Sequence, residues 1–513
     1  MNGAEALVRT LVNAGVELCF TNPGTSEMHF VAALDRVAGM RPVLGLFEGV
    51  VSGAADGYAR MAEKPAATLL HLGPGLANGL ANFHNAQKAR SPIVSIVGDH
   101  ALPHQRYETP LSSDVVAVAA PFSGWVHAAR DSRALPEDAA RAVVAAHGPP
   151  GCVATLVVPA DVAWSEPSEP AALPPLRKRE TVAAEKIRAA AGALRSGEPA
   201  ALLMTGESLR ARCLETASSI AVATGARLFC DTFNARLERG AGRAAIEPLP
   251  YFAEGVMEAL AGTRHLVLVG TQAPIAFFAY PGLPSALTPE GCQVHELASP
   301  AEDAPAALEA LADELGAQEA PSLELATPAL SPSGALGPAS MGASLAALLP
   351  EGAIVVDESI TGALALQPAT RGAPPHDWLS LTGGAIGQGI PLAAGAALAC
   401  PSRKVVCLEG DGSAMYTIQG LWSQAREGLD VTTVILANRS YAILQIELAR
   451  VGAGEAGQRA QDMLEIRRPD IDTVKLAEGL GVPASRASTA EQFHAQLAEA
   501  MAEPGPRLIE AVI

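Results

Sequence analysis

The sequence predicts an α/β protein with three doubly wound parallel-sheet domains. Short apolar runs alternate with helical runs along the chain, which is typical of parallel strands joined by crossover helices. Two proline-rich stretches, 165–176 and 321–338, interrupt this alternation and are typical of extended linkers. A chain of 513 residues also has room for about three domains of ordinary size. We therefore expect domains and linkers at 1–164, 165–185, 186–315, 316–338 and 339–513.

In the first domain, two apolar runs end at residues that can carry chemistry. The run 44–47 ends at Glu48, and a helix rich in small residues is predicted over 50–60. A second run ends at His71, before a Gly-Pro-Gly sequence at 73–75 that predicts a tight turn. We expect both side chains at the carboxyl edge of the sheet, where a histidine can relay protons. The alternatives are a solvated acid at a helix start and a histidine that only hydrogen-bonds the turn.

The central domain is predicted from four apolar runs separated by helical runs. They are expected to form buried parallel strands at 200–205, 227–231, 266–270 and 293–297. A glycine-rich dinucleotide fingerprint does not follow any of these runs. The sequence therefore leaves open whether this domain binds FAD or another nucleotide.

The last domain contains the most informative pattern, a strand, a helix and a strand predicted at 404–409, 415–427 and 431–437. A right-handed crossover makes the two strands parallel, so the residues that follow them meet at one sheet edge. Asp411 and Asn438 hold these positions, 27 residues apart. A carboxylate and an amide oxygen suit Mg²⁺, which completes its shell with water and phosphate oxygens. The alternative is a bare strand-to-helix turn in which Asp411 caps the helix.

Composition and charge exclude several classes of protein. Hydrophobic residues make up 49% of the chain and charged residues 18%, so large cores can form. The net charge of −18, without a basic run, argues against nucleic acid and anionic membranes as partners. Seven cysteines without Cys-x-x-Cys pairs predict neither zinc nor disulfides and fit a reducing cytoplasm, and the N-terminus does not resemble a signal peptide. The apolar stretch 383–400 contains Pro391 and several glycines, so we expect a loop and a buried helix there rather than a membrane span.

The motif around Asp411 resembles the signature of thiamine-diphosphate enzymes, in which Gly-Asp-Gly is followed by Asn at a similar distance. In that family the Asp and Asn side chains, with a backbone carbonyl two residues beyond the Asn, hold Mg²⁺ against the cofactor's diphosphate. The resemblance thus implies Asp411, Asn438 and Ser440 as metal ligands. It implies further cofactor contacts at Gly410, Gly412, Ser413 and Tyr441.

A second motif resembles the same family. Glu48, followed by a small-residue helix that ends Gly-Tyr-Ala-Arg at 57–60, is similar to the segment whose Glu contacts the aminopyrimidine ring. The resemblance implies that Glu48 favours the imino form of that ring, which removes the C2 proton of the thiazolium. Gly384 and Ile386 match a turn whose apolar side chain props the cofactor into a bent shape; a plain core isoleucine is the alternative.

The resemblance also implies an assembly and a substrate class. It predicts a pyrimidine-binding first domain, a central domain and a diphosphate-binding last domain. Active sites would form between subunits, so that a dimer or a tetramer is the active unit, and the substrate would be a 2-oxo acid.

Within the family, benzoylformate decarboxylases are similar at 22–27, Glu48, 55–59 and His71. This resemblance places a hydroxyl, here Thr25, beside the substrate carboxylate and gives His71 a catalytic role. The chain departs from it in two places. Phe277 or its neighbours stand where those enzymes have a second active-site histidine. Glu447 takes the approximate place of a pocket aromatic, although a lone Glu is usually a solvated one.

We therefore predict a thiamine-diphosphate- and Mg²⁺-dependent 2-oxo acid decarboxylase, with carboligation onto an aldehyde as a second outcome. Acetolactate synthases, which bind FAD in the central domain, also resemble the whole chain but match less well at the site: Ile446 replaces a tryptophan. A 2-hydroxyacyl-CoA lyase remains open. An inactive cofactor-binding regulatory subunit is disfavoured by Glu48, and a plain nucleotide-binding protein by the lack of a phosphate loop.

Overall fold

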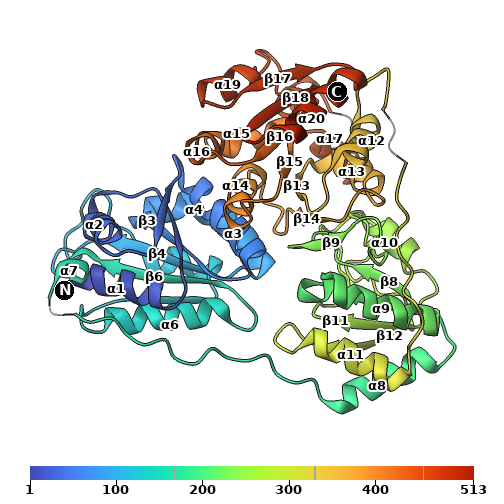
Figure 1. Ribbon diagram of the computed structural model, residues 1–513, viewed down its shortest axis with the longest axis horizontal. Coiled ribbons are helices and arrows are strands. Elements are labelled where there is room, and N and C mark those ends of the chain that lie inside the picture. The colour runs from blue at the N-terminus through green and yellow to red at the C-terminus, as the bar shows by residue number, and fades with distance from the viewer. Residues whose placement is uncertain (167, 329–330, 455) are drawn as a thin grey trace.

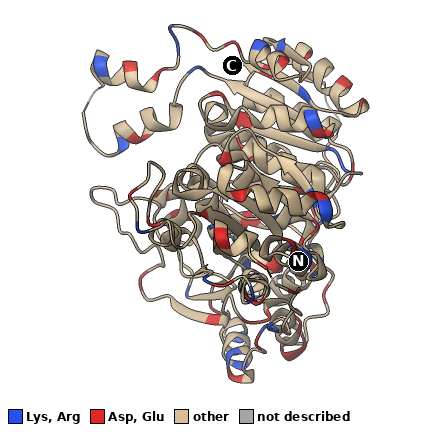
Figure 2. Ribbon diagram, turned by 90° about the vertical axis from the view of Figure 1, so that its left-hand side faces the viewer, with Lys and Arg blue, Asp and Glu red and all other residues tan. Residues whose placement is uncertain are grey.

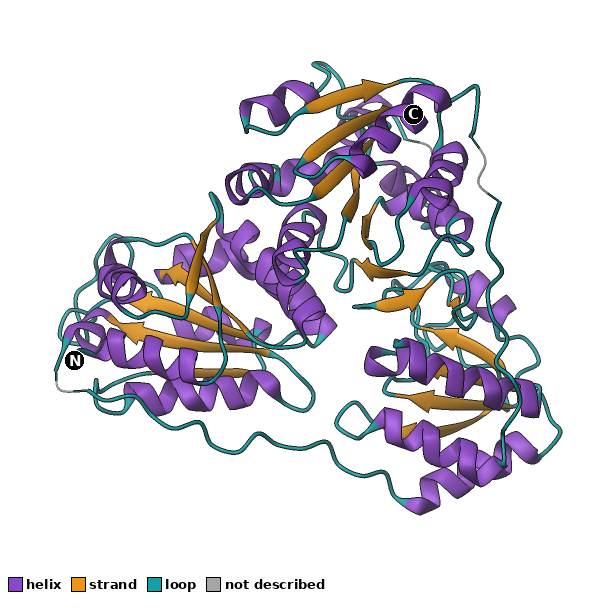
Figure 3. Cartoon of the chain, viewed as in Figure 1, coloured by secondary structure: helices purple, strands orange, loops and turns teal. Residues whose placement is uncertain are grey.

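The computed structural model describes residues 1–166, 168–328, 331–454 and 456–513. It has three α/β domains, each built on its own sheet, and so confirms the predicted fold class (Figures 1 and 3). Helices cover the faces of the sheets, and the large hydrophobic cores lie between the helices and the strands. None of the helices in the described residues is long and apolar enough to cross a membrane. Lys and Arg are interspersed with Asp and Glu along the ribbon (Figure 2).

The first sheet has six parallel strands in the order β2-β1-β3-β4-β6-β5. Its strands are β1 (Leu18–Thr21), β2 (Arg41–Leu44), β3 (Ala66–His71), β4 (Ile93–Asp99), β5 (Trp125–Ala128) and β6 (Val153–Pro159). Its helices are α1 (Gly3–Asn13), η1 (Thr25–Glu27), α2 (Met28–Arg36), α3 (Glu48–Ala62), α4 (Leu72–Ala89), α5 (Val115–Ala119), η2 (Ala120–Phe122), α6 (Leu135–His147) and α7 (Ala160–Trp164).

Two predicted features of this domain are wrong. The Gly-Pro-Gly sequence at 73–75 is not a turn but part of the first turn of α4, where a proline is tolerated because the first N–H groups of a helix lack helical partners. The strand before Glu48 ends at Leu44 rather than at Phe47. Glu48 itself begins α3, so its expected place at the start of a small-residue helix is confirmed.

The second sheet has five parallel strands in the order β10-β8-β7-β11-β12, including the four that were predicted. They are β7 (Ala200–Met204), β8 (Arg227–Cys230), β10 (Glu247–Pro248), β11 (His265–Val269) and β12 (Gln293–Ala298). The helices around them are α8 (Ala184–Arg195), η3 (Gly206–Leu209), α9 (Ala211–Thr224), α10 (Ala253–Ala259) and α11 (Ala304–Leu315).

The third sheet has seven strands in the order β17-β18-β16-β15-β13-β14-β9. Its own segment supplies β13 (Ile354–Glu358), β14 (His376–Ser380), β15 (Val405–Gly410), β16 (Val431–Ala437), β17 (Ala484–Ala487) and β18 (Arg507–Val512). The helices of this segment are α12 (Pro338–Leu348), η4 (Ile360–Gly362), α13 (Ala363–Ala369), α14 (Gly389–Ala399), α15 (Asp411–Thr417), α16 (Gly420–Glu427), α17 (Ala442–Arg450), α18 (Gln458–Leu464), α19 (Thr473–Gly479) and α20 (Ala490–Ala502).

The third sheet departs from the prediction in two respects. Its edge strand, β9 (Leu237–Arg239), comes from the middle of the chain and pairs antiparallel with β14. The single helix predicted over 415–427 is two helices, α15 and α16, of which the first already begins at Asp411. At Gly420 a Cβ atom would lie 2.8 Å from Ile390 Cγ2, so the break brings α16 close to α14.

Helices α3 and α14 pack backbone against backbone and join the first domain to the third. A Cβ atom at Gly57 would lie 2.0 Å from the Leu392 carbonyl oxygen, and one at Gly395 would lie 1.9 Å from the Ala54 carbonyl oxygen. Only glycine allows such an approach. The stretch 383–400 is thus a loop followed by a buried helix, as predicted.

A buried ion pair lies beside this helix crossing. Arg60 Nη2 donates to Asp56 Oδ2 (2.7 Å), and both side chains are almost fully buried. Gln388 also donates to Asp56, and Arg60 donates to the Ser380 carbonyl. Because each charge is paired and hydrogen-bonded across two domains, the network fixes how the first domain meets the third.

Candidate active site

Asp411 and Asn438 lie at the same edge of the third sheet, as the sequence predicts. Gly410, the last residue of β15, pairs in register with Leu436 of β16. Asp411 Oδ2 accepts a hydrogen bond from the Arg439 N–H (2.5 Å), and its Oδ1 accepts one from the Gly412 N–H (2.9 Å). Burial raises the pKa of Asp411, while these backbone donors oppose the rise. The two motif turns are therefore in direct contact.

The turn after β16 is sharp and contains a left-handed residue. Arg439 adopts a left-handed φ of 58°, which reverses the chain immediately after Asn438. Asn438 Oδ1 accepts the Ser440 N–H (2.9 Å), and the Ser440 hydroxyl donates to the Leu464 carbonyl (3.1 Å). A Cβ atom at Gly412 would lie 2.5 Å from the Tyr441 ring, so the glycine is needed for this close contact.

The donor set at this edge fits Mg²⁺ and a diphosphate. It offers one carboxylate, on Asp411, with the amide oxygen of Asn438 and the backbone carbonyl of Ser440. The residues that the structure describes contain no group of three or more His, Cys, Asp or Glu side chains placed to bind a metal. A site with a single carboxylate is acceptable to Mg²⁺, which takes its remaining ligands from phosphate and water, but would be poor for zinc.

The loop over 384–387 lies beside α15. Gly384 and Gly387 have left-handed φ values of 74° and 92°, and a Cβ atom at Gly387 would lie 2.5 Å from the Tyr416 Cβ. Ile386 is half-buried rather than part of the sealed core. The loop thus combines a tight turn with a partly accessible apolar side chain, the two features expected from the sequence.

A buried acid, Glu358, holds this loop, and the sequence analysis missed both Glu358 and its buried neighbour Glu409. Glu358 Oε1 accepts the Gly387 N–H (2.5 Å), and its Oε2 accepts the Gly389 N–H. Burial raises the pKa of Glu358 to about 7 and that of neighbouring Glu409 well above its usual range. The periodic apolar runs around these residues conceal them, because an acid at the end of a strand normally faces water.

Glu48 and His71 both lie at the carboxyl edge of the first sheet. Glu48 is half-buried, and its Oε2 accepts a hydrogen bond from Asn78 Nδ2 (3.0 Å). A Cβ atom at Gly75 would lie 3.2 Å from Glu48 Oε1 and 3.3 Å from the His71 Cβ, so the two side chains flank the start of α4. Thr25 is exposed at the start of η1, next to Gly24, where a Cβ atom would overlap the His71 ring.

Glu27 is the partner of His71, a role that the sequence analysis did not assign. Glu27 Oε2 accepts hydrogen bonds from the His71 ring at Nδ1 (2.9 Å) and from the Gly24 N–H (2.8 Å). The carboxylate is buried, and burial raises its pKa although the His71 charge opposes the rise. A Cβ atom at Gly98 would lie 1.7 Å from Glu27 Oε1, so packing holds the carboxylate against the histidine. The signal available in the sequence was an acid after β1 and a histidine at the end of β3, which are neighbouring strands.

Asn82 of α4 connects the two groups of site residues. Its Nδ2 donates to the Gly49 carbonyl (2.8 Å) and to the Gly387 carbonyl (3.1 Å). One side chain thus ties the start of α3, where Glu48 lies, to the loop of the third domain that carries Ile386.

The structure shows the surroundings of Phe277 and Glu447, the two residues at which the sequence departs from the family pattern. Phe277 is 45% exposed and packs against Phe233 and Tyr251, with ring centroids 5.3 and 5.1 Å away. The sequence favoured a solvated acid at Glu447, but this residue is half-buried. Both of its carboxylate oxygens accept the Tyr280 hydroxyl, at 2.8 and 3.0 Å. It thereby ties α17 to the central domain.

Comparison with known proteins supports a common origin over the whole chain. Two protein-family models match the chain. The model described as "Thiamine pyrophosphate enzyme, N-terminal TPP binding domain" matches residues 1–118, and the model described as "Thiamine pyrophosphate enzyme, C-terminal TPP binding domain" matches residues 361–511. A Mycobacterium tuberculosis protein named "Putative acetolactate synthase large subunit IlvX" is 57% identical over 100% of this chain and 99% of its own length. Benzoylformate decarboxylase from Pseudomonas aeruginosa is 29% identical over 97% of this chain and 96% of its own length.

A solved structure agrees. The thiamine diphosphate-dependent 4-hydroxybenzoylformate decarboxylase of Rhodococcus jostii superposes with a TM-score of 0.86 at 26% identity, covering 99% of this chain and 98% of that one. The two matched motifs, the three-sheet fold and these full-length relatives lead to one assignment. The chain belongs to the thiamine pyrophosphate enzymes of the acetolactate synthase and benzoylformate decarboxylase family.

Proposed function

We propose that this protein is a thiamine-diphosphate- and Mg²⁺-dependent decarboxylase of a 2-oxo acid. The observation that carries the proposal is the grouping of Glu48 with the Glu27–His71 pair at one sheet edge. A regulatory subunit that only binds the cofactor has no need of a histidine oriented by a buried carboxylate. Two relatives named as benzoylformate decarboxylases, one in sequence and one in structure, support the same reaction class.

Each residue has a distinct task in this proposal. Thiamine diphosphate supplies, when bound, a thiazolium carbon that adds to a keto group and takes up the electrons released with CO₂. Asp411, Asn438 and the Ser440 carbonyl would hold Mg²⁺, and Glu48 would hydrogen-bond the aminopyrimidine ring. Glu27 accepts at His71 Nδ1, which leaves Nε2 of the imidazole to move a proton at the substrate.

We infer that the working enzyme is a dimer or a tetramer with active sites between subunits. Residues for the pyrimidine ring lie on the first sheet and residues for the diphosphate lie on the third. Thr25 is exposed, which suits a contact with a substrate carboxylate held between two chains. FAD binding in the central domain is best tested on the purified protein, by its flavin absorbance.

A panel of 2-oxo acids tests the function directly. The protein, with thiamine diphosphate and Mg²⁺, should release CO₂ from at least one acid and yield the aldehyde. The 57% identical relative named as an acetolactate synthase favours a second candidate, carboligation onto another 2-oxo acid. The panel is therefore run with and without an acceptor. Product that forms only with a second 2-oxo acid would replace the decarboxylase proposal by the synthase one.

Removing the candidate metal ligand should prevent cofactor uptake. Asp411→Ala leaves only neutral oxygens for Mg²⁺, so we expect affinity for thiamine diphosphate in the presence of Mg²⁺ to fall by at least about 100-fold in calorimetry. Asp462→Asn, which changes an exposed acid paired with Arg468, is the control and should bind normally. Unchanged uptake by Asp411→Ala would remove this residue from the metal site.

Glu27→Gln should impair the proton relay without disturbing substrate binding. The amide can still accept the His71 hydrogen bond but no longer stabilises an imidazolium, so we expect kcat to fall by about 10- to 100-fold with KM nearly constant. The acidic limb of the kcat profile against pH should move to lower pH. Glu5→Gln, at a surface pair with Arg36, serves as the control. An unshifted profile would make Glu27 a purely structural residue.

A further inference from the structure

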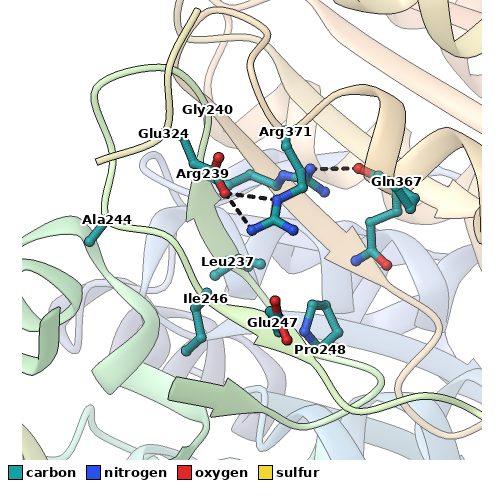
Figure 4. Close-up of a pocket in the computed structure, with 11 residues that line it drawn as sticks. Leu237, Arg239, Gly240, Ala244, Ile246, Glu247, Pro248, Glu324, Gln367 and Arg371 are labelled. Atoms are coloured by element: carbon teal, nitrogen blue, oxygen red, sulfur yellow. Dashed lines mark hydrogen bonds and ion pairs between the residues drawn. The ribbon is translucent and has the colours of Figure 1, made fainter. Parts of the chain in front are cut away.

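A second pocket lies at the opposite edge of the third sheet from the candidate cofactor site. Its volume is about 230 Å³, and β9, the linker around Glu324 and the end of α13 line it (Figure 4). Arg239 of β9 pairs with His376, the first residue of β14, whereas Asp411 follows the last residue of the parallel strand β15. The pocket is therefore at the amino edge of the sheet and Asp411 is at the carboxyl edge.

Arg239 provides a buried and largely unused cation in this pocket. Its side chain stacks over Trp378, with the guanidinium carbon 4.9 Å from the ring centroid, and the residue is only 8% exposed. Nη2 donates to the Gln367 carbonyl (2.6 Å), and this bond is one of those drawn in Figure 4. Among the residues that the structure describes, no carboxylate lies within ion-pair distance of it. A buried guanidinium without an anion is costly, because burial removes the hydration of the charge.

The other charged groups of the pocket already have partners. Glu324 Oε1 lies 2.8 Å from Arg371 Nε and 2.7 Å from its Nη2. Glu247 is exposed and lies 3.8 Å from Arg227. Burial, with the nearby Arg371, lowers the pKa of Arg239 to about 10, although Glu324 opposes the fall. The uncompensated charge in the pocket is thus positive.

We propose that this pocket binds a small organic monocarboxylate, with the carboxylate on Arg239 and a short apolar body against Leu237, Ile246 and Pro248. A planar guanidinium recognises a carboxylate by parallel hydrogen bonds, and the three apolar residues line the same pocket. The volume lies between the ~150 Å³ cavity that holds benzene and the ~300 Å³ of the smallest drug-sized sites, so it suits an acid of about benzoate size. The site is independent of the proposed reaction.

Calorimetry on the full-length, cofactor-loaded protein tests the proposal with 3-methylbutanoate as the probe. The acid should bind at least about tenfold more tightly than 3-methylbutan-1-ol, which has the same apolar body without the charge. Quenching of the fluorescence of Trp378 should accompany binding and disappear in Trp378→Phe. Equal affinity for the acid and the alcohol would overturn the proposal.

Variants locate the site. Arg239→Met should weaken binding of 3-methylbutanoate at least about tenfold, Arg239→Lys should weaken it less, and Glu324→Gln should strengthen it by releasing Arg371 from its partner. His71→Ala should bind the acid normally, since it alters only the candidate active site. Loss of binding in His71→Ala with no change in Glu324→Gln would place the acid in the active site and refute the second pocket, even if Arg239→Met failed to fold.

Discussion

Glu48→Gln should abolish turnover while Mg²⁺-linked uptake of thiamine diphosphate stays nearly normal. The amide keeps the size of the side chain and can still accept from Asn78, so the start of α3 should not change. It can no longer share a proton with the ring nitrogen of the cofactor, which is the contact that the proposed reaction needs. We expect a loss of at least about 1,000-fold in kcat, measured as CO₂ release, because general acid–base catalysis alone contributes about 100- to 10,000-fold.

Glu63→Gln is a matched control, because it makes the same change immediately after the other end of α3. Glu63 is the C-cap residue of the helix and pairs on the surface with Arg210 and Arg236. Exposed pairs of this kind contribute little, so this variant should keep full activity. If Glu48→Gln released CO₂ as fast as Glu63→Gln, Glu48 would not be catalytic.

Gly57→Ala should lower the stability of the protein sharply, although it adds a single methyl group. The new Cβ would lie 2.0 Å from the Leu392 carbonyl oxygen, and a backbone atom cannot move aside as a flexible side chain can. Separation of α3 from α14 would also loosen the buried Asp56–Arg60 network. We expect a loss of about 3 kcal/mol or more, seen as a fall of about 10 °C in the apparent melting temperature.

Gly192→Ala shows what the same substitution does in a helix without such a contact. Gly192 lies inside α8, and nothing comes within 4 Å of a Cβ atom built there. This variant should be as stable as the original protein or up to about 1 kcal/mol more stable, because alanine is the better helix former. Equal melting temperatures for the two variants would mean that the helix crossing has room to relax.

Local patterns in the sequence were sufficient to predict the fold class and the candidate metal site. A strand, a crossover helix and a parallel strand bring the residues after each strand to one edge whatever the rest of the chain does. Asp411 and Asn438 could therefore be placed from their spacing. Glu48 and His71 could be placed at the edge of the first sheet for the same reason, because each follows an apolar run.

Other features depend on pairings that no local pattern reveals. Glu27 faces His71 only because β1 and β3 are neighbours in the sheet, and strand order cannot be read from periodicity. The three residues of β9 are too few to give a strand signal, and their partner lies in another part of the chain. At 73–75 the turn preference of Gly-Pro-Gly was overridden, since a proline near the start of a helix is compatible with continued helical structure.

The edge strand β9 has a consequence for how the protein is made. Because Leu237–Arg239 leave the ribosome long before His376 does, the nascent chain carries a strand whose partner has not yet been synthesised. The last segment cannot complete the third sheet by itself, because its edge strand comes from the middle of the chain. The last two domains are therefore coupled in their biogenesis as well as in their architecture.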